Sequence, residues 1–199
     1  MLREIRPAIL MVIMFTLLTG IAYPLAMTGI GQVIFPWQAN GSLVEKDGKV
    51  IGSALIGQVF TDDRYFHGRP SATNYADPND PTKTVDAPYN AANSMGSNLG
   101  PTSKTLVDRV ATAAEKLKTE NTKPIPVDLV TTSGSGLDPD ITPAAAEFQI
   151  PRVAKARGMS EEALHDLVAS HTRGRVLGVI GEPYVRVLEL NQALDELKK

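Results

Sequence analysis

The hydrophobic positions form one long run near the N-terminus and only short periodic stretches after it. No Lys, Arg, Asp, Glu or His occurs between Pro7 and Val44, and residues 8–35 are mostly apolar. A helix needs about 20 mostly apolar residues to cross a bilayer core about 30 Å thick. The pattern therefore predicts a tail over residues 1–6 and a membrane-spanning helix over residues 7–35, with its membrane core at about residues 9–30.

The charges on either side of this run indicate its orientation. Arg3 and Arg6 precede it, whereas the first charges after it are the mixed set at positions 45–49. Because Lys and Arg next to a membrane segment favour the cytoplasmic side, we expect a cytoplasmic tail and an extracytoplasmic domain over residues 36–199. The alternative is a cleaved signal peptide, with cleavage near Ala26 releasing a secreted binding protein. The run is longer than the ~7–15 apolar residues of a signal peptide, which favours an uncleaved anchor.

One side of the predicted membrane helix is rich in small and weakly polar residues. At about 100° per residue, this side is formed by Thr16, Gly20, Tyr23, Pro24, Met27 and Gly31. Such a stripe lets a partner helix approach closely, although Gly and Pro are also simply more frequent in membrane helices. Pro24 removes a backbone hydrogen bond and is expected to bend the helix. Since Tyr23 is the only ionisable side chain at membrane depth, we expect an anchor and no ion path.

The polar remainder predicts helices and strands in mixed order, which is typical of an α+β domain. A hairpin is expected around Asp47-Gly48, and helices are expected to begin after the capping residues Thr102 or Ser103, Thr142, and Ser160. Pro151 should kink or split the second of these helices, and Gly158 should end it. The other expected elements are a short strand at 55–60, a helix to about residue 121, strands at 127–131 and 184–190, a helix at about 161–170, and a last helix capped by Asn191.

Residues 61–102 show no periodicity and are rich in Asp, Asn, Gly and Pro, so a long irregular segment is expected there. We expect its aromatic residues Tyr65, Phe66, Tyr75 and Tyr89 to attach it to the core. Loops of this length in compact domains are usually functional.

Composition excludes several classes of function. The formal net charge of the 199 residues is −2, which leaves no basic stripe for nucleic acid. Cysteine is absent, which excludes disulfides and thiolate metal sites, and the three histidines lack zinc-site spacing, so no metal site is expected.

A hydrolase is the catalytic alternative that the residues leave open. It would use Ser133 or Ser135 with the Asp138 or Asp140 carboxylate, but the G-x-S-x-G elbow is missing. We expect this Gly/Ser loop to satisfy its own backbone, and therefore expect no catalytic residues.

A cationic cluster follows a short distance along the chain. Arg152, Lys155 and Arg157 could meet an anion, but a solvated helix face is the more common arrangement and is expected here.

Several motifs together resemble one membrane-protein family. Residues 130–143 (VTTSGSGLDPDITP) run on into AAAEFQIPRVAKAR, and YFHGRPSA at 65–72, SNLG at 97–100 and VLELN at 187–191 accompany them. This set is similar to the C subunit of the Kdp potassium-transporting ATPase, over essentially the whole chain. Met95 stands where that family usually has glycine, and the stretch 74–87 is longer than usual.

The resemblance implies an accessory, non-pore subunit of a bacterial inner-membrane complex that imports potassium at the expense of ATP. Its partners would be a channel-like potassium-translocating subunit, a P-type ATPase subunit and a small membrane subunit. The resemblance also implies no cofactor of its own, and a chaperone-like role that raises the affinity of the ATPase subunit for ATP, with Gln149 at the position of a nucleotide-contacting glutamine. A domain outside the cytoplasm cannot meet cytoplasmic ATP, so from the residues alone we expect Gln149 to tie down its helix before Pro151.

Overall fold

The computed structural model describes residues 2–197 and consists of two compact units, residues 1–53 and 54–199. The boundary therefore lies inside the predicted 36–199 domain, and the first hairpin belongs to the N-terminal unit. Each unit is described by itself.

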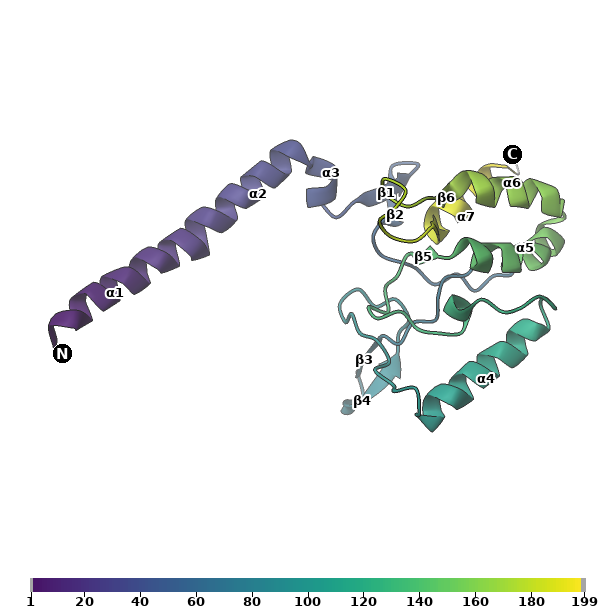
Figure 1. The fold of residues 1–199 in the computed structure, drawn as a ribbon, viewed down its shortest axis with the longest axis horizontal. Helices are drawn as coiled ribbons and strands as arrows, with labels where there is room; N and C mark the ends of the chain where they lie inside the picture. The colour runs from purple at the N-terminus through teal and green to yellow at the C-terminus, as the bar shows by residue number, and fades with distance from the viewer. Residues whose placement is uncertain (1, 198–199) are drawn as a thin grey trace. The chain divides into compact units, whose positions relative to one another are not determined.

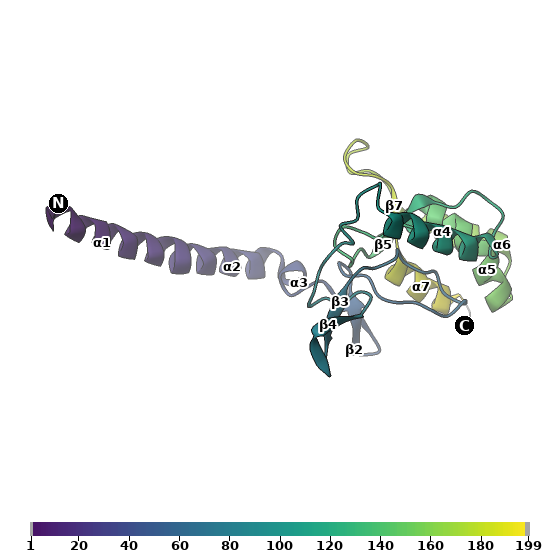
Figure 2. The same ribbon diagram turned by 90° about the horizontal axis from the view of Figure 1, so that it is seen from below.

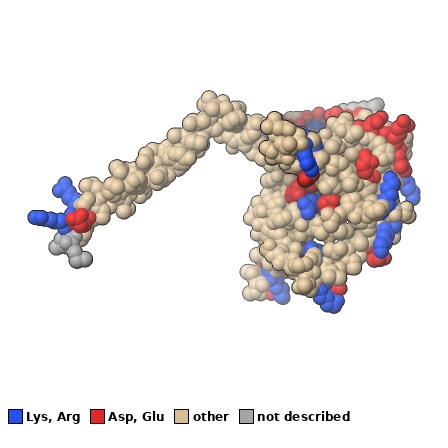
Figure 3. Space-filling view, in the orientation of Figure 1, with Lys and Arg blue, Asp and Glu red and all other residues tan. Residues whose placement is uncertain are grey.

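The N-terminal unit is dominated by one continuous helix (Figure 1). It consists of α1 (Leu2–Leu17), a π-helical turn η1 (Leu18–Ala22) and α2 (Tyr23–Ile34). The part from Arg3 to Ile34 has 32 residues and contains an 18-residue window with a mean hydropathy of 2.1, and its only charged side chains lie at its N-terminal end (Figure 3). The prediction of a single apolar helix long enough to cross a bilayer is confirmed.

The π-helical turn explains how this helix contains Pro24. The Tyr23 N–H donates to the Leu18 carbonyl, five residues back, so the turn ahead of the proline is wider than in an α-helix. A proline ring would otherwise clash with the carbonyl four residues before it, here that of Gly20. The extra residue shifts the register by about 100°. With this shift, we expect Thr16 and Gly20 to share a face with Pro24, Thr28 and Gly31, and Tyr23 and Met27 to be displaced from it.

The N-terminal unit ends in a hairpin of the predicted kind. After the short helix α3 (Pro36–Ala39), strands β1 (Leu43–Lys46) and β2 (Lys49–Ser53) pair in antiparallel fashion. Asp47 and Gly48 have φ angles of 52° and 72°, as the Asp-Gly turn of a two-residue hairpin requires.

The second unit has its core where three helices meet a small sheet (Figures 1 and 2). The helices are α5 (Pro143–Arg157), α6 (Glu161–His171) and α7 (Val187–Glu196), and the antiparallel sheet has the order β5 (Asp140–Ile141), β7 (Tyr184–Arg186), β6 (Thr172–Arg173). The largest fully buried apolar side chains are Phe66, Ile150, Leu164, Leu190, Leu194, Val153, Val168 and Val185. Helix α4 (Lys104–Lys118) is amphipathic and buries no residue completely.

The helix ends are predicted well by local chemistry. The Thr142 and Ser160 hydroxyls accept hydrogen bonds from backbone N–H groups in the first turns of α5 and α6. Ser103 stands at the N-cap position of α4, but its side chain makes no capping hydrogen bond. Gly158 ends α5 with a φ of 65°. Pro151 does not split α5, which runs through it without interruption.

Four expectations about strands are wrong. Residues 55–60 form a turn and an extended segment, and Val127–Leu129 is a 3-10 turn (η2) whose Asp128 carboxylate accepts hydrogen bonds from the backbone and hydroxyl of Thr142. The irregular segment 61–102 contains a hairpin, β3 (Asn74–Asp77) with β4 (Asp80–Asp86), that is too polar to show alternation. Finally, β7 ends at Arg186 and Asn191 lies inside α7, where it faces the core together with Val187 and Leu194.

The long loops pack tightly against one another. A Cβ on Gly57 would lie 2.4 Å from the Tyr89 ring and 2.5 Å from the Asp138 carbonyl oxygen, so only glycine fits there. The Tyr89 hydroxyl donates to the Arg69 carbonyl at 2.7 Å. Phe66 is fully buried, as expected for an aromatic attachment point, whereas Tyr75 is 42% exposed on its hairpin.

Candidate functional site

Two buried amide side chains form hydrogen bonds with the backbone N–H and carbonyl groups of two consecutive residues, Phe66 and His67. Asn191 on α7 accepts from the Phe66 N–H at 2.9 Å and donates to the Phe66 carbonyl at 2.9 Å. Gln149 on α5 does the same for His67, at 2.8 Å and 3.1 Å. Both amides are only 2% exposed. Each side chain thus replaces the neighbouring strand that this irregular segment lacks, and we call residues 62–69 the clamped segment.

The Arg152 guanidinium extends this network. Its Nη1 donates to the carbonyls of Asp63 and Tyr65 at 2.8 Å and 3.1 Å, and its Nη2 donates to Gln149 Oε1 at 2.8 Å. Its Nε donates to Glu120 at 3.0 Å, so the buried positive charge is paired. The Arg152 side chain is 8% exposed and holds the clamped segment.

Arg157 holds the same segment at Arg64, between the two carbonyls that Arg152 contacts. Its Nε donates to the Arg64 carbonyl at 2.7 Å, its Nη2 pairs with Asp195 at 2.7 Å, and the guanidinium lies 4.8 Å from the centre of the Tyr65 ring. The solvated helix face expected for Arg152, Lys155 and Arg157 is therefore wrong for the two arginines and right for Lys155, which is exposed. The arginines turn inward because the irregular backbone beside them needs donors.

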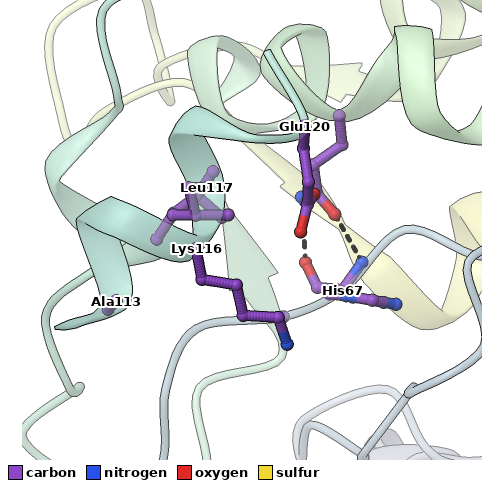
Figure 4. Close-up of a pocket in the computed structure, with 8 residues that line it drawn as sticks. His67, Ala113, Lys116, Leu117 and Glu120 are labelled. Atoms are coloured by element: carbon purple, nitrogen blue, oxygen red, sulfur yellow. Dashed lines mark hydrogen bonds between the residues drawn. The ribbon is translucent and has the colours of Figure 1, made fainter.

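A small cavity lies between the clamped segment and α4 (Figure 4). Its volume is about 170 Å³, below the ~300–1,000 Å³ typical of small-molecule pockets. Gln149 lines it, but the Gln149 amide already takes part in four hydrogen bonds, with His67, Ala145 and Arg152. The remaining lining residues are His67, Gly68, Ala113, Lys116, Leu117, Glu120 and Leu129.

The imidazole of His67 is also drawn into this network. Its Nε2 lies 3.1 Å from the Asp62 carbonyl oxygen and 3.4 Å from Arg152 Nη1. Burial, and secondarily the positive charge of Arg152, lowers the pKa of His67 below its ordinary value of 6.5. The neutral imidazole is therefore the form that the fold favours.

The two serines of the hydrolase alternative act as turn caps. The Ser133 hydroxyl accepts from the Gly136 N–H at 2.9 Å, and the Ser135 hydroxyl accepts from the Leu137 N–H at 3.1 Å. The histidines interact elsewhere: His67 with Asp62, His165 with Glu147 and His171 with Leu167. A serine nucleophile needs a base within reach, and this arrangement supplies none within residues 2–197.

The two carboxylates of that alternative are engaged by arginines. Asp138 pairs with Arg69 at 3.1 Å and Asp140 with Arg186 at 3.2 Å. Burial raises the pKa of Asp140, and Arg186 opposes this effect. Both carboxylates thus connect the 130–143 loop to neighbouring segments.

Comparison with known proteins gives a full-length match. The family model described as "K+-transporting ATPase, c chain" matches residues 5–196. The chain is similar to proteins named "Potassium-transporting ATPase KdpC subunit": it is 70% identical to the one from Bradyrhizobium diazoefficiens over 98% of both chains, and 67% identical to the one from Rhodopseudomonas palustris (strain BisB18) over 100% of both. A third, from Methylobacterium nodulans, is 65% identical over 99% of this chain and 98% of that protein.

The chain belongs to the KdpC family. It is therefore an accessory subunit of a potassium-import complex, and the resemblance stated from its motifs is confirmed. Those motifs are the parts that the structure brings together: YFHGRPSA is the clamped segment and its continuation, AAAEFQIPR carries Gln149 and Arg152, and VLELN carries Asn191.

Sequence reasoning named Gln149, the two arginines and Asn191 but did not bring them together, because it expected the arginines on a solvated helix face and Asn191 at a helix cap. A buried role for Asn191 and Arg152 could have been inferred from the sequence, since each polar residue lies at a helical position among apolar residues that are buried. Their partners are backbone groups more than 80 residues away, which no local pattern reveals.

Replacing Gln149 with Leu should destabilise the domain strongly. The substitution leaves the His67 N–H and carbonyl without partners, and each buried unsatisfied group costs about 1–3 kcal/mol, so we expect the free energy of unfolding to fall by about 2–5 kcal/mol. Urea unfolding of the full chain in detergent, followed by circular dichroism, measures it. Lys155→Leu, at an exposed position of the same helix, should change the value by less than about 0.5 kcal/mol. Equal effects of the two substitutions would contradict the clamp.

The stability of the domain should depend on pH through His67. Because the folded-state pKa is lowered, the unfolded chain binds the proton more readily, and stability is lost as the pH falls below about 6.5. His67→Gln removes this contribution. Thermal unfolding midpoints measured between pH 7.5 and 5.5 should therefore fall more steeply in the unsubstituted chain than in the variant; parallel curves would refute this role.

Proposed function

We propose that the chain is a non-catalytic accessory subunit, anchored by its N-terminal helix in the bacterial inner membrane. Its tail is cytoplasmic and its α+β domain lies on the outer face. The observation that carries this proposal is the full-length match to a potassium-transporting ATPase subunit. In addition, the side chains considered for catalysis, such as Ser133 and Asp138, form hydrogen bonds and ion pairs within the fold.

The proposed partners are the other chains of the ATPase: a channel-like potassium-translocating subunit, a P-type ATPase subunit and a small membrane subunit. One helix without charges at membrane depth cannot conduct ions by itself. The sequence also has neither the TVGYG filter of potassium channels nor a D-K-T-G-T phosphorylation motif. Transport and ATP hydrolysis are thus assigned to the partners.

The chaperone-like role in ATP binding is part of this proposal in a modified form. Gln149 uses its amide to hold His67 and to meet Arg152, and the cavity that Gln149 itself lines has a volume of about 170 Å³. We therefore propose that an effect on the ATP affinity of the ATPase subunit is transmitted through contacts between subunits, with no direct contact between Gln149 and the nucleotide.

The tagged full chain, purified in mild detergent, should carry the other ATPase chains with it. Gly20→Leu should reduce their amount several-fold, because a bulky side chain on the small-residue face keeps a partner helix away. Ala26→Leu adds the same kind of bulk on the opposite side and should leave co-purification unchanged. Recovery of the unsubstituted chain alone would refute the accessory role.

The orientation can be measured with single cysteines, because the natural chain has none. Lys118→Cys, exposed on α4, should react with a membrane-impermeant maleimide in intact spheroplasts. Glu4→Cys, in the tail, should react only after permeabilisation. The reverse pattern would show that the domain is cytoplasmic, and a water-soluble product without its N-terminal residues would support the signal-peptide alternative.

A further inference from the structure

The loop between β6 and β7 exposes four aliphatic side chains together. It extends away from the body of its unit as a narrow projection (Figure 2), and we call residues 174–182 the apolar finger. Val176, Leu177, Val179 and Ile180 are 65%, 87%, 74% and 61% exposed. Contiguous apolar surface of this kind marks an interaction site on a soluble domain.

The finger is a built turn with its own hydrogen bonds. Val176 and Ile180 exchange backbone hydrogen bonds at 2.9 Å and 3.0 Å, and the Gly178 N–H donates to the Arg175 carbonyl at 3.1 Å. At its base, Arg175 Nη2 donates to both carboxylate oxygens of Glu182, at 2.7 Å and 2.9 Å. The turn that carries the four side chains is therefore pre-organised, which lowers the conformational entropy lost when they are buried against a partner.

The backbone at the tip of the finger is strained at Leu177, whose side chain is exposed. Leu177 has a φ of 54°, in the left-handed region that costs energy for most residues and that Gly, Asn or Asp would adopt more easily. A large aliphatic side chain in this conformation, at 87% exposure, gains nothing from its own domain. Strain that the isolated domain does not need points to a function at that position.

We propose that the apolar finger inserts into an apolar pocket on another chain of the potassium-transporting ATPase, with Leu177 as the central contact. This rests on the proposed function, since it requires a partner chain on the same side of the membrane as the domain. A protein pocket is favoured over lipid by the composition of the finger. It lacks the aromatic residues typical of interfacial anchors, and the opposite charges at its base neutralise each other and do not attract anionic headgroups.

The test compares Leu177→Asp with Val127→Asp in the tagged full chain. Asp tolerates the left-handed conformation, so Leu177→Asp should leave the unfolding midpoint of the isolated chain unchanged or raised. It should reduce the other ATPase chains that co-purify by about tenfold or more, as loss of a central contact residue does. Val127 is 71% exposed elsewhere on the domain, and its replacement should have no such effect. If the unsubstituted chain brings its partners and both variants do so equally, the finger proposal fails alone; if the unsubstituted chain brings none, the proposed function fails with it.

A fluorophore on Leu177→Cys identifies what covers the finger. An environment-sensitive dye there should shift to the blue in the purified complex, and should not shift in the full chain alone in phosphatidylethanolamine–phosphatidylglycerol vesicles. A shift in those vesicles would assign the finger to the lipid surface, and disulfide-linked dimers of the Leu177→Cys chain would assign it to a second copy. Either result overturns the proposal.

Discussion

The fold of the second unit depends on satisfying the backbone of one irregular segment without a sheet. The chain goes from exposed residues at Asp63 and Arg64 to the fully buried Phe66 and the partly buried His67, where water cannot complete every backbone hydrogen bond. Gln149 and Asn191 satisfy the backbone hydrogen bonds of His67 and Phe66. Arg152 and Arg157 donate to backbone carbonyls of the residues just before these two. Because these four side chains come from α5 and α7, the segment binds the two helices to the N-terminal part of the unit.

The same constraint explains what several conspicuous polar groups of the domain do. The two arginines, the Ser133 and Ser135 hydroxyls, and the carboxylates of Asp138 and Asp140 all hold loops together. By contrast, the apolar N-terminal helix and the apolar finger are exposed. A chain with its chemistry used internally and its apolar faces exposed is suited to assembly with other subunits.

Local signals predicted the elements whose cause is local. The apolar run, the Asp-Gly turn and the caps at Thr142 and Ser160 act within a few residues, and each is found where expected. The strands expected at 127–131 and 184–190 are wrong because hydrogen bonds to other segments of the chain prevailed over the local pattern. Asp128 bonds to Thr142, and the Val187 N–H bonds to the Pro139 carbonyl as the helix begins. Pro24 was expected to bend the membrane helix. The π-helical turn before it, and the shift of register that follows, became visible only in the backbone hydrogen bonds of the structure.

The sequence alone determined the anchor, the mixed helix and strand content and, through long motifs, the family, since these depend on composition and on neighbouring residues. Only the tertiary structure showed that Gln149, Asn191 and the two arginines converge on one segment, and that the finger stands free of the core. The physical reason is that burial and hydrogen bonding between residues more than 80 positions apart arise from packing, and a pattern read along the chain contains no information about which backbone group each side chain will meet.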